Sequence, residues 1–449
     1  MQGAQVPIAR DIARCRDVLA RNSRGNVLSA GGIHRGMRSQ MSRRLLTLVL
    51  SVTAIGSAAC AERITRSDEI SAIDDTPGTV PWKAVSAGAY DSCAIVLSGT
   101  AHCWGSDLVG CSLTGCPVNS RPTLIGGARQ FTSISEGGRY HCGILDGPGE
   151  AWCWGSTTIG SLGDGVTLNS ATPVRVAIPH RVERVSVGFE HACAVTNTGV
   201  AYCWGGIGPM LGYDDVDRSA LPRPVATTLR FSSISAGTTH TCGIAGNGDA
   251  YCWGGGYGTL GIGSRDTACT ISTSCFTSAV PQLVDGGLRW ASISAGNTVT
   301  CGVTVDSRGY CWGAVRHNGE TPPPHSRLGN GSTSGSKTPV PISGGFSFRV
   351  ISIGTRHACG LTTDGAAYCW GSNSGGQLGT GHTRDDITTP QPVVGGLTFT
   401  SISVAEPSCG ISRGMNLYCW GVTSGGALGN GQSGPGRMPV PTRVLAPAP

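Results

Sequence analysis

The sequence lacks the features that mark several common classes of protein. The apolar run from Leu45 to Ile55 is shorter than the about 20 residues that a membrane-spanning helix needs. No segment shows a helical hydrophobic period, and no nucleophile elbow, zinc-protease motif or pair of carboxylates occurs at a recognisable spacing. We therefore expect neither an enzyme nor a cofactor, and we assign no catalytic or metal-binding residue.

A basic surplus is also missing outside the first 60 residues. The formal net charge of the chain is +6. Residues 1–60 carry nine arginines against Asp11 and Asp17, which is +7, so the remaining residues sum to −1. A protein that binds nucleic acid through its phosphates needs a basic patch. The charge distribution therefore gives nucleic-acid binding no support.

The residues before the first repeat read as a leader and a linker. Two arginines, the apolar run and a group of small residues are typical of a secretory signal, so we expect a signal peptide over residues 41–60. Residues 1–40 are interpreted as a mis-assigned upstream start, with Met41 or Met37 as the initiator, or alternatively as a basic leader. Residues 61–81 are expected to be a linker.

The end of the predicted signal resembles a lipid-attachment site. Cys60 follows Ser57 and two alanines, as in bacterial lipoproteins. Those proteins usually carry an aliphatic residue three positions before the cysteine, where this chain has Ser57, so ordinary cleavage at a small-residue site is the alternative. We expect a lipid anchor at Cys60.

One short motif recurs through the rest of the chain. The sequence Cys-Trp-Gly places its tryptophan at intervals of 50, 50, 49, 59, 58 and 50 residues. The seven tryptophans are Trp104, Trp154, Trp204, Trp253, Trp312, Trp370 and Trp420. This regular spacing indicates a repeat protein with one unit of about 50 residues for each motif.

Each Cys-Trp-Gly motif has a second cysteine upstream. In the unit from 240 to 254, a Gly-Asn-Gly turn at 246–248 favours an antiparallel hairpin on which Cys242 and Cys252 face each other. Disulfides are therefore predicted, and zinc is the alternative, although zinc ligands normally lie two to four residues apart. An export signal with evenly paired cysteines indicates an oxidising compartment. The predicted pairs are Cys93–Cys103, Cys142–Cys153, Cys193–Cys203, Cys242–Cys252, Cys301–Cys311, Cys359–Cys369 and Cys409–Cys419, together with Cys111–Cys116 and Cys269–Cys275.

Each unit contains four short segments that alternate apolar with small or polar residues. In residues 231–284 they are FSSISAG, HTCGIAG, DAYCWG and, after LGIG, PQLV. Gly and Pro separate the segments, which favours four strands in each unit and an all-β ring of four-stranded antiparallel blades. The first segment is small, which suits a crowded axis, and the tryptophans are expected to act as spacers between neighbouring blades.

The repeat resembles the regulator of chromosome condensation repeat. The pattern G-x-x-H-x-C, a turn, Y-C-W-G, L-G-x-G and P-x-x-V carries the resemblance, and the unit at 354–381 matches it along its whole length. The resemblance implies a seven-bladed β-propeller over residues 82–445, followed by a tail at 446–449. The cysteines depart from the family pattern and are typical of its secreted bacterial relatives. The chain starts within a unit and ends on PTRVL, so we expect its two ends to complete the ring together.

The motif histidine is present in only some of the units. It is found at His191, His240 and His357, and it is replaced by Asp91, Tyr140, Val299 and Pro407. A ring of imidazoles that binds a metal is one interpretation. The histidines lie on different blades, and the resemblance implies a structural role at this position, so packing is the favoured interpretation.

Three units carry long insertions, at 106–121, 264–280 and 314–327. Insertions on equivalent connections tend to fall on one face of a repeat protein, often the binding face, and drifted surface loops are the alternative. Arginine and aromatic side chains carry a large share of interface energy. The predicted partner-binding residues are Arg265, Asp266, Phe276, Arg316, His317, Glu320 and His325.

Together these features predict an exported, non-enzymatic, monomeric propeller that binds a protein or other macromolecule at the bacterial cell envelope. It is expected in the periplasm or on the outer surface, attached to the membrane only through the lipid anchor, and otherwise secreted. One alternative, implied by the resemblance, is nucleotide exchange on a small GTPase, although export separates the chain from cytoplasmic GTP. Another is an extracellular hydrolase or lyase acting on polysaccharide or peptide, which needs convergent acidic or histidine side chains at the tunnel mouth.

Overall fold

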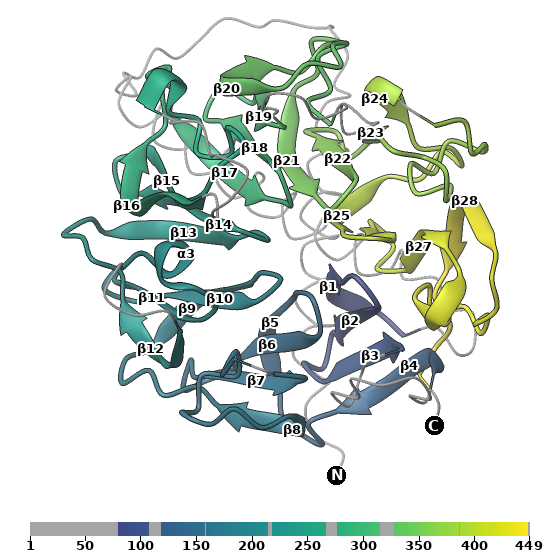
Figure 1. Cartoon of the computed structure of the whole chain (residues 1–449). Coiled ribbons are helices and arrows are strands. Elements are labelled where there is room, and N and C mark those ends of the chain that lie inside the picture. Colours follow the sequence, from purple (N-terminus) through teal and green to yellow (C-terminus); the bar gives the residue numbers. More distant parts are fainter. Residues whose placement is uncertain are drawn as a thin grey trace, which may run out of the picture. The chain divides into compact units, whose positions relative to one another are not determined.

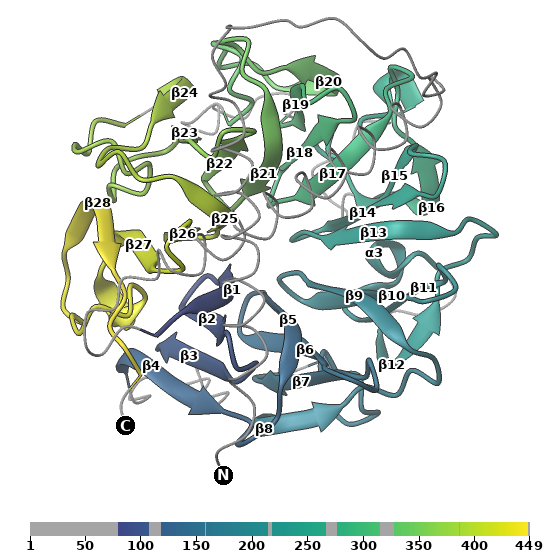
Figure 2. The ribbon, with the colours of Figure 1, turned by 180° about the vertical axis from the view of Figure 1, so that it is seen from behind.

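A computed structural model describes residues 80–106, 118–157, 159–213, 218–265, 276–314, 327–385 and 387–447. They belong to one compact unit, Thr76–Pro449. Within these ranges the chain forms seven four-stranded antiparallel sheets, which are the blades of a propeller arranged around a central tunnel (Figures 1 and 2). The all-β, seven-bladed fold predicted from the sequence is therefore confirmed. Cys60 and the predicted pairs Cys111–Cys116 and Cys269–Cys275 lie outside the described residues.

The strands of each blade follow one another in chain order from the tunnel outward. The innermost strands are β1 (Trp82–Ala87), β5 (Phe131–Glu136), β9 (Val182–Val187), β13 (Phe231–Ala236), β17 (Trp290–Ala295), β21 (Phe348–Ile353) and β25 (Phe399–Val404). The second strands are β2 (Asp91–Val96), β6 (Tyr140–Leu145), β10 (His191–Thr196), β14 (His240–Ala245), β18 (Val299–Thr304), β22 (His357–Thr362) and β26 (Ser408–Ser412).

The third strands carry the Cys-Trp-Gly motif. They are β3 (Ala101–Gly105), β7 (Ala151–Gly155), β11 (Ala201–Gly205), β15 (Ala250–Gly255), β19 (Gly309–Gly313), β23 (Ala367–Gly371) and β27 (Leu417–Val422). The outer strands are β4 (Asn119–Ile125), β8 (Ser170–Arg175), β12 (Ser219–Pro224), β16 (Phe276–Leu283), β20 (Ser336–Pro341), β24 (Ile387–Pro392) and β28 (Arg437–Arg443). Short helical turns are α3 (Gly208–Leu211), η1 (Gly263–Arg265) and η2 (Ser424–Gly426). No helix in the described ranges is long and apolar enough to cross a membrane.

The cysteines of each second and third strand lie directly opposite each other. In blade 4, for example, Cys242 is paired in register with Cys252 on the neighbouring strand. All seven predicted hairpin disulfides are present, with Cα–Cα distances of 4.0 to 4.1 Å. The seven disulfides indicate an oxidising, extracytoplasmic compartment.

The hydrophobic core lies between the blades. Each of the seven buried clusters combines residues of two neighbouring blades. The Cys-Trp-Gly tryptophans are fully buried there. The indole of Trp312 in blade 5 donates to the carbonyl of Thr259 in blade 4 at 2.8 Å, and Trp104 in blade 1 reaches Ala427 in blade 7 at 2.9 Å. The predicted role of these tryptophans as spacers between blades is confirmed.

A closed circle of seven hydrogen bonds joins the innermost strands. In each blade one serine hydroxyl accepts a bond from a backbone N–H of the next blade, at 2.9 to 3.2 Å. Glycines let the strands approach: a Cβ on Gly137 would lie 1.9 Å from the carbonyl oxygen of Gly188. The small residues predicted for the crowded axis therefore also join the blades.

The two ends of the propeller complete the ring together, as expected: Trp82 of the first blade and Val444 of the last lie in one buried cluster. The closing contacts include the bond from Ala87 N to Ser403 Oγ and a backbone bond from Trp82 to Met415. Blade 1 (β1 to β4) and blade 7 (β25 to β28) are each built from one continuous segment. The expectation that the chain starts within a unit was wrong, because the stretch from Trp82 already supplies a complete innermost strand.

Candidate functional site

Two kinds of connection meet at one end of every blade. In six of the seven blades the turn between the first and second strands is bonded to the end of the third strand or the residue after it, as in the backbone bonds from Ser106 to Tyr90, from Gly255 to Thr239 and from Ala314 to Thr298, at 2.7 to 3.1 Å. We call this end the turn face. The ends of all three insertions belong to these third-to-fourth connections, so they lie on one face, as predicted.

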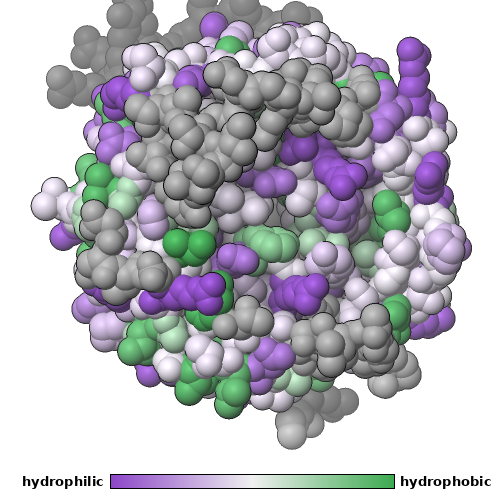
Figure 3. Space-filling view, viewed as in Figure 1, coloured by the Kyte–Doolittle hydropathy of each residue, from purple (hydrophilic) through white to green (hydrophobic). Residues whose placement is uncertain are grey.

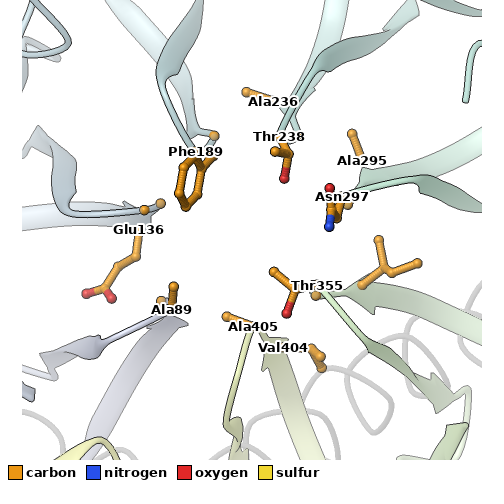
Figure 4. A pocket seen from close by; sticks show the side chains of 18 of the residues that line it. Ala89, Glu136, Phe189, Ala236, Thr238, Ala295, Asn297, Thr355, Val404 and Ala405 are labelled. Atoms are coloured by element: carbon orange, nitrogen blue, oxygen red, sulfur yellow. The ribbon is translucent and has the colours of Figure 1, made fainter. Parts of the chain in front are cut away.

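The turns of the turn face surround the tunnel. Figure 4 shows Phe189, Thr238, Asn297 and Thr355 around the opening, while Glu136 is directed away from it. The tunnel cavity has a volume of about 100 Å³. Its polar side chains come from blades 4 to 6, and Phe189 of blade 3 is the large apolar one. The opening therefore has a polar side and an apolar side.

A broader hollow extends from the tunnel mouth over blades 6, 7 and 1, and we call it the basin. It consists of two adjoining cavities of about 560 and 650 Å³ that share Arg356, Glu406, Val422 and Ser424. The first is completed by Tyr90, Phe189, Pro407 and their neighbours, and the second by Arg437, Pro435 and Gln377. The space-filling view in Figure 3 shows polar and apolar residues interspersed over one face of the molecule.

The basin is positively charged and carries exposed aromatic rings. Tyr90 and Phe189 are 45% and 44% exposed. Arg356 and Arg437 are exposed, and neither guanidinium has an ion pair or hydrogen bond within the described residues. Burial and the positive charge of Arg356 lower the pKa of nearby Arg327 to about 10, against the opposing effect of Glu406. The basin can therefore accept an anionic group beside an apolar one.

The predicted partner-binding residues are only partly described. Arg265 ends η1, where its guanidinium forms an ion pair with Asp285 and donates to the carbonyl of Leu283 at 2.9 Å. Phe276 begins β16, but its side chain lies outside the described residues. Asp266, Arg316, His317, Glu320 and His325 also lie outside them. This set of partner-binding residues therefore stays a prediction.

The motif histidines join neighbouring blades. Nε2 of His191, His240 and His357 lies 2.7 to 2.8 Å from the hydroxyl of Thr241, Thr300 and Ser408, respectively. Each hydroxyl donates to a carbonyl, as Thr300 does to Thr259 at 2.8 Å, so the histidine Nε2–H must donate to the hydroxyl. Burial lowers the pKa of His191 to about 4 and of His240 and His357 to about 3, so these imidazoles are neutral. Their role is structural, as predicted.

The junction between blades 1 and 2 has a different composition. Asp91 replaces the motif histidine, and Oδ2 of Asp91 lies 3.3 Å from Nε2 of His141 on the next blade. Oε1 of Glu136 lies 3.4 Å from Nδ1 of the same imidazole. All three side chains are buried, and the carboxylate oxygens make no hydrogen bond of standard geometry among the described residues. We call these three residues the acid–histidine cluster.

The carboxylates decide the charge of this cluster. Burial alone would lower the pKa of His141, but Asp91 and Glu136 outweigh it and raise that pKa to about 10. Burial, opposed by His141 and assisted by Asp91, raises the pKa of Glu136 to about 8. Near neutral pH the cluster therefore holds an imidazolium at His141 and a protonated Glu136.

Sequence reasoning missed both the basin and the acid–histidine cluster. Arg356 and Glu406 occupy the position before the motif histidine, which differs among the seven repeats, as do the positions on either side of it. Glu136 ends an innermost strand where the other six end in Ala, Val or Ile. An alignment of the seven repeats with one another would have marked Glu136 but not the basin. It would not have shown that Asp91 and His141 meet across two blades.

These observations define a class of protein: a seven-bladed β-propeller with one disulfide in each blade. Residues 182–206, 231–258 and 348–377 match one description of the regulator of chromosome condensation (RCC1) repeat, and residues 247–303 and 364–411 match a second. The chain is therefore a propeller of RCC1-type repeats, as the resemblance implied. A secreted bacterial origin stays a prediction.

Known proteins share parts of this chain. It is 32% identical over 132 residues to E3 ubiquitin-protein ligase HERC2 of Homo sapiens and 39% identical over 69 residues to ultraviolet-B receptor UVR8 of Arabidopsis thaliana. These matches cover 28% and 15% of this chain but only 2% and 16% of the relatives. The crystal structure of Prp20p from Saccharomyces cerevisiae superposes with a TM-score of 0.63 and 21% identity, over 81% of this chain and 87% of that one. At this identity the likeness supports the fold alone.

Proposed function

We propose that this chain is an exported, non-enzymatic scaffold that binds a protein partner at the cell envelope through its turn face. The observation that carries the proposal is the basin. Arg356 and Arg437 line it together with the exposed rings of Tyr90 and Phe189. Neither arginine has an ion pair among the described residues. Arginine and aromatic side chains in a pocket are the groups that most often dominate binding energy. The basin therefore supplies anchors of both kinds.

The charge distribution favours a partner with a local anionic segment. Residues 61–449 sum to about −1, so the propeller has no strong long-range field to attract partners. Within the basin, however, two exposed arginines are opposed by Glu406 alone, whose Oε1 accepts a hydrogen bond from Thr355. A partner segment with a carboxylate beside an apolar side chain is the chemistry that fits.

The extracytoplasmic location indicated by the seven disulfides supports an envelope partner rather than a cytoplasmic GTPase. Attachment through a lipid on Cys60 remains part of the proposal. A mass spectrum of the purified N-terminus tests it, because a mature chain that begins elsewhere removes the anchor.

Capture of envelope proteins by the exported chain tests the basin. We expect the variant Arg356→Glu/Arg437→Glu to fold normally and to lose the captured partner, because it reverses both charges. The variant Lys83→Glu/Arg308→Glu is the matched control, because it changes the net charge by the same amount away from the basin: Lys83 is the second residue of β1, and Arg308 forms an ion pair with exposed Asp306 at 3.1 Å. Unchanged capture by the charge-reversed variant would remove the basin from the proposal.

The insertion of blade 5 tests the surface that the sequence predicted. Residues 316–326 can be shortened to the six-residue length of the equivalent stretch of blade 6, at 372–377. If this loop contributes, the shortened chain keeps its melting temperature but captures less partner. If capture is unchanged, Arg316, His317, Glu320 and His325 are not partner contacts and the basin acts alone.

A further inference from the structure

The acid–histidine cluster places a disulfide sulfur beside the imidazole. Sγ of Cys93 lies 3.8 Å from Nδ1 of His141. Oε1 of Glu136 lies 3.4 Å from the same nitrogen, while Asp91 faces the other ring nitrogen, Nε2. Among the described residues, the sulfur of Cys93, a carboxylate oxygen of Glu136 and a nitrogen of His141 form the one group of potential metal ligands whose atoms all lie within 4.8 Å of one another.

We propose that the disulfide of blade 1, once opened, leaves a binding site for a zinc-class divalent cation. Its protein ligands are the Cys93 thiolate, the Glu136 carboxylate and Nδ1 of His141. With the disulfide closed, Sγ of Cys93 carries no thiolate charge and is not a ligand. The carboxyl groups of Glu136 and Asp91 lie at different nitrogens of the His141 ring, so an ion bound to one nitrogen is reached by only one of them. The disulfide therefore controls whether the site exists.

The distances fit tetrahedral coordination. With bonds of about 2.0 Å to oxygen and nitrogen and about 2.3 Å to sulfur, a tetrahedral zinc ion places its nitrogen and oxygen ligands about 3.3 Å apart and its nitrogen and sulfur ligands about 3.6 Å apart. The observed separations are 3.4 Å and 3.8 Å. The third separation, between Sγ of Cys93 and the carboxylate oxygen of Glu136, is within 4.8 Å, against about 3.6 Å in a tetrahedral site. Two of the three separations therefore already fit, and the Glu136 side chain must rotate to bring its oxygen closer to the sulfur. Cys103, freed by the same cleavage, or a water molecule can take the fourth position.

Asp91 can hold the His141 ring in the orientation that metal binding needs. A histidine that binds zinc usually donates its other N–H to a carboxylate, which fixes the ring and its tautomer. Oδ2 of Asp91 lies 3.3 Å from Nε2 of His141, whereas Cys93 and Glu136 face Nδ1. Asp91 is therefore a positioning residue, and it acts through His141.

A dithiol can supply the two electrons that open the Cys93–Cys103 disulfide. One thiolate of the dithiol attacks Sγ of Cys103, the bond between the two cysteine sulfurs breaks, and Cys93 leaves as a thiolate. The second thiol of the reductant then displaces Cys103, so the dithiol is oxidised to its own disulfide while two electrons reduce the protein bond. The ion takes the Cys93 thiolate and replaces the protons held by His141 and Glu136, which pass to solvent.

The other described hairpins lack the remaining ligands. Sγ of Cys193 lies 3.9 Å from the hydroxyl of Thr241, and Sγ of Cys359 lies 3.8 Å from the hydroxyl of Ser408. A neutral hydroxyl is a poor zinc ligand beside a thiolate. The same hairpin geometry in blades 3 and 6 therefore serves as an internal control for blade 1.

Cobalt binding by single-cysteine variants tests the proposal without reducing the other disulfides. Cys103→Ser leaves Cys93 free beside the cluster, and Cys203→Ser leaves Cys193 free in the equivalent place of blade 3. We expect the first variant to bind one Co²⁺ with a thiolate charge-transfer band that Zn²⁺ removes, and the second to show no such band. Adding Glu136→Gln should weaken binding at least about tenfold, and adding Asp91→Asn should weaken it about 10- to 100-fold while the thiolate band persists.

The unaltered chain gives a second test that does not depend on how the variants fold. In one glutathione buffer, Zn²⁺ should raise the reduced fraction of the Cys93–Cys103 pair and leave the other six hairpin pairs unchanged, as read by alkylation and peptide mass spectrometry. The absence of a charge-transfer band in Cys103→Ser, an equal band in Cys203→Ser, or an equal effect of Zn²⁺ on all seven pairs would each overturn the proposal.

Discussion

At the junction between blades 4 and 5, Nε2 of His240 donates to the hydroxyl of Thr300 at 2.8 Å. At the junction between blades 1 and 2, the same two positions hold Asp91 and His141, and Glu136 joins them from the end of β5. The first junction is neutral and the second contains an imidazolium with two acidic side chains. Both are fully buried between the same strands of the repeat.

The comparison concerns two positions of the repeat. The residue two places before the first cysteine of one blade contacts the residue one place before the first cysteine of the next blade, as His240 contacts Thr300. Where the first position is a histidine, the next blade supplies a hydroxyl. Where it is Val299, the next blade supplies Ala358, and where it is Tyr140, the next blade supplies Ala192, within shared apolar clusters. At the junction of blades 7 and 1 the two positions hold Pro407 and Ser92, whose hydroxyl donates to the carbonyl of Ala427 at 3.4 Å. The backbone framework is constant, and at the other six junctions the local chemistry changes in matched pairs.

Removal of the imidazole should separate the two junctions most strongly. In His141→Ala, Asp91 and Glu136 remain buried without their cation, which costs about 3 to 5 kcal/mol of unfolding free energy when a buried pair is broken. Denaturant unfolding at neutral pH measures the loss. His357→Ala, at a neutral junction, is the control and should cost less, and equal losses would contradict an ionic junction between blades 1 and 2.

The pH dependence of stability should differ in sign between the junctions. The pKa of Glu136 rises from 4.5 to about 8 and that of His141 from 6.5 to about 10, so the folded chain holds these protons more tightly than the unfolded chain. Their stabilisation is complete at low pH and is lost as the pH rises through the folded values. The lowered pKa values of His191, His240 and His357 instead reduce stability as the pH falls below 6.5.

A triple variant tests the alkaline part of this prediction. Asp91→His/Glu136→Ala/His141→Thr copies the neutral junction of blades 4 and 5 into blades 1 and 2. Between pH 6.5 and 10 the unaltered chain should lose on the order of 6 kcal/mol more unfolding free energy than the variant, about two thirds of it from His141 and one third from Glu136. Urea unfolding at several pH values gives the difference. Parallel curves for the two chains would show that the cluster does not titrate as described.

The smallest effect is expected from exchanging one matched pair for another. His240→Val and Thr300→Ala should each destabilise by about 1 to 2 kcal/mol, because each leaves a buried polar group without its partner. The double variant copies the Val299–Ala358 pair and should cost less than the sum of the two single changes, with a coupling of about 1 kcal/mol. Additive losses would mean that these positions are chosen independently.

The sequence alone was sufficient to predict the blades, their four strands and the seven disulfides. These features repeat seven times, so the pattern of Cys242, Cys252 and Trp253 is supported by six further copies. That the first blade is complete could not be predicted, because this blade matches the repeat motif poorly. Its completeness depends on the pairing of β1 with β2. Repetition predicts what is common to the blades and says little about what differs.

The candidate site depends on those differences. Arg356, Glu406 and Tyr90 come from three blades, so their meeting depends on the curvature of the ring rather than on any local spacing. The sequence analysis instead predicted binding at the long insertions, because these lengthen the spacing between the repeated motifs. The described ends of these insertions lie on the turn face, as predicted, whereas a hollow made of single substitutions leaves no comparable local signal.

Histidine side-chain nitrogen NMR tests the central comparison most directly, because it reports the charge of each junction at its own imidazole. The account predicts that His141 stays doubly protonated at neutral pH and loses its proton only near pH 10. His191, His240 and His357 should be neutral with the proton on Nε2 and should remain so down to about pH 4. A neutral His141 at pH 7, or three other histidines that titrate near pH 6.5, would contradict it.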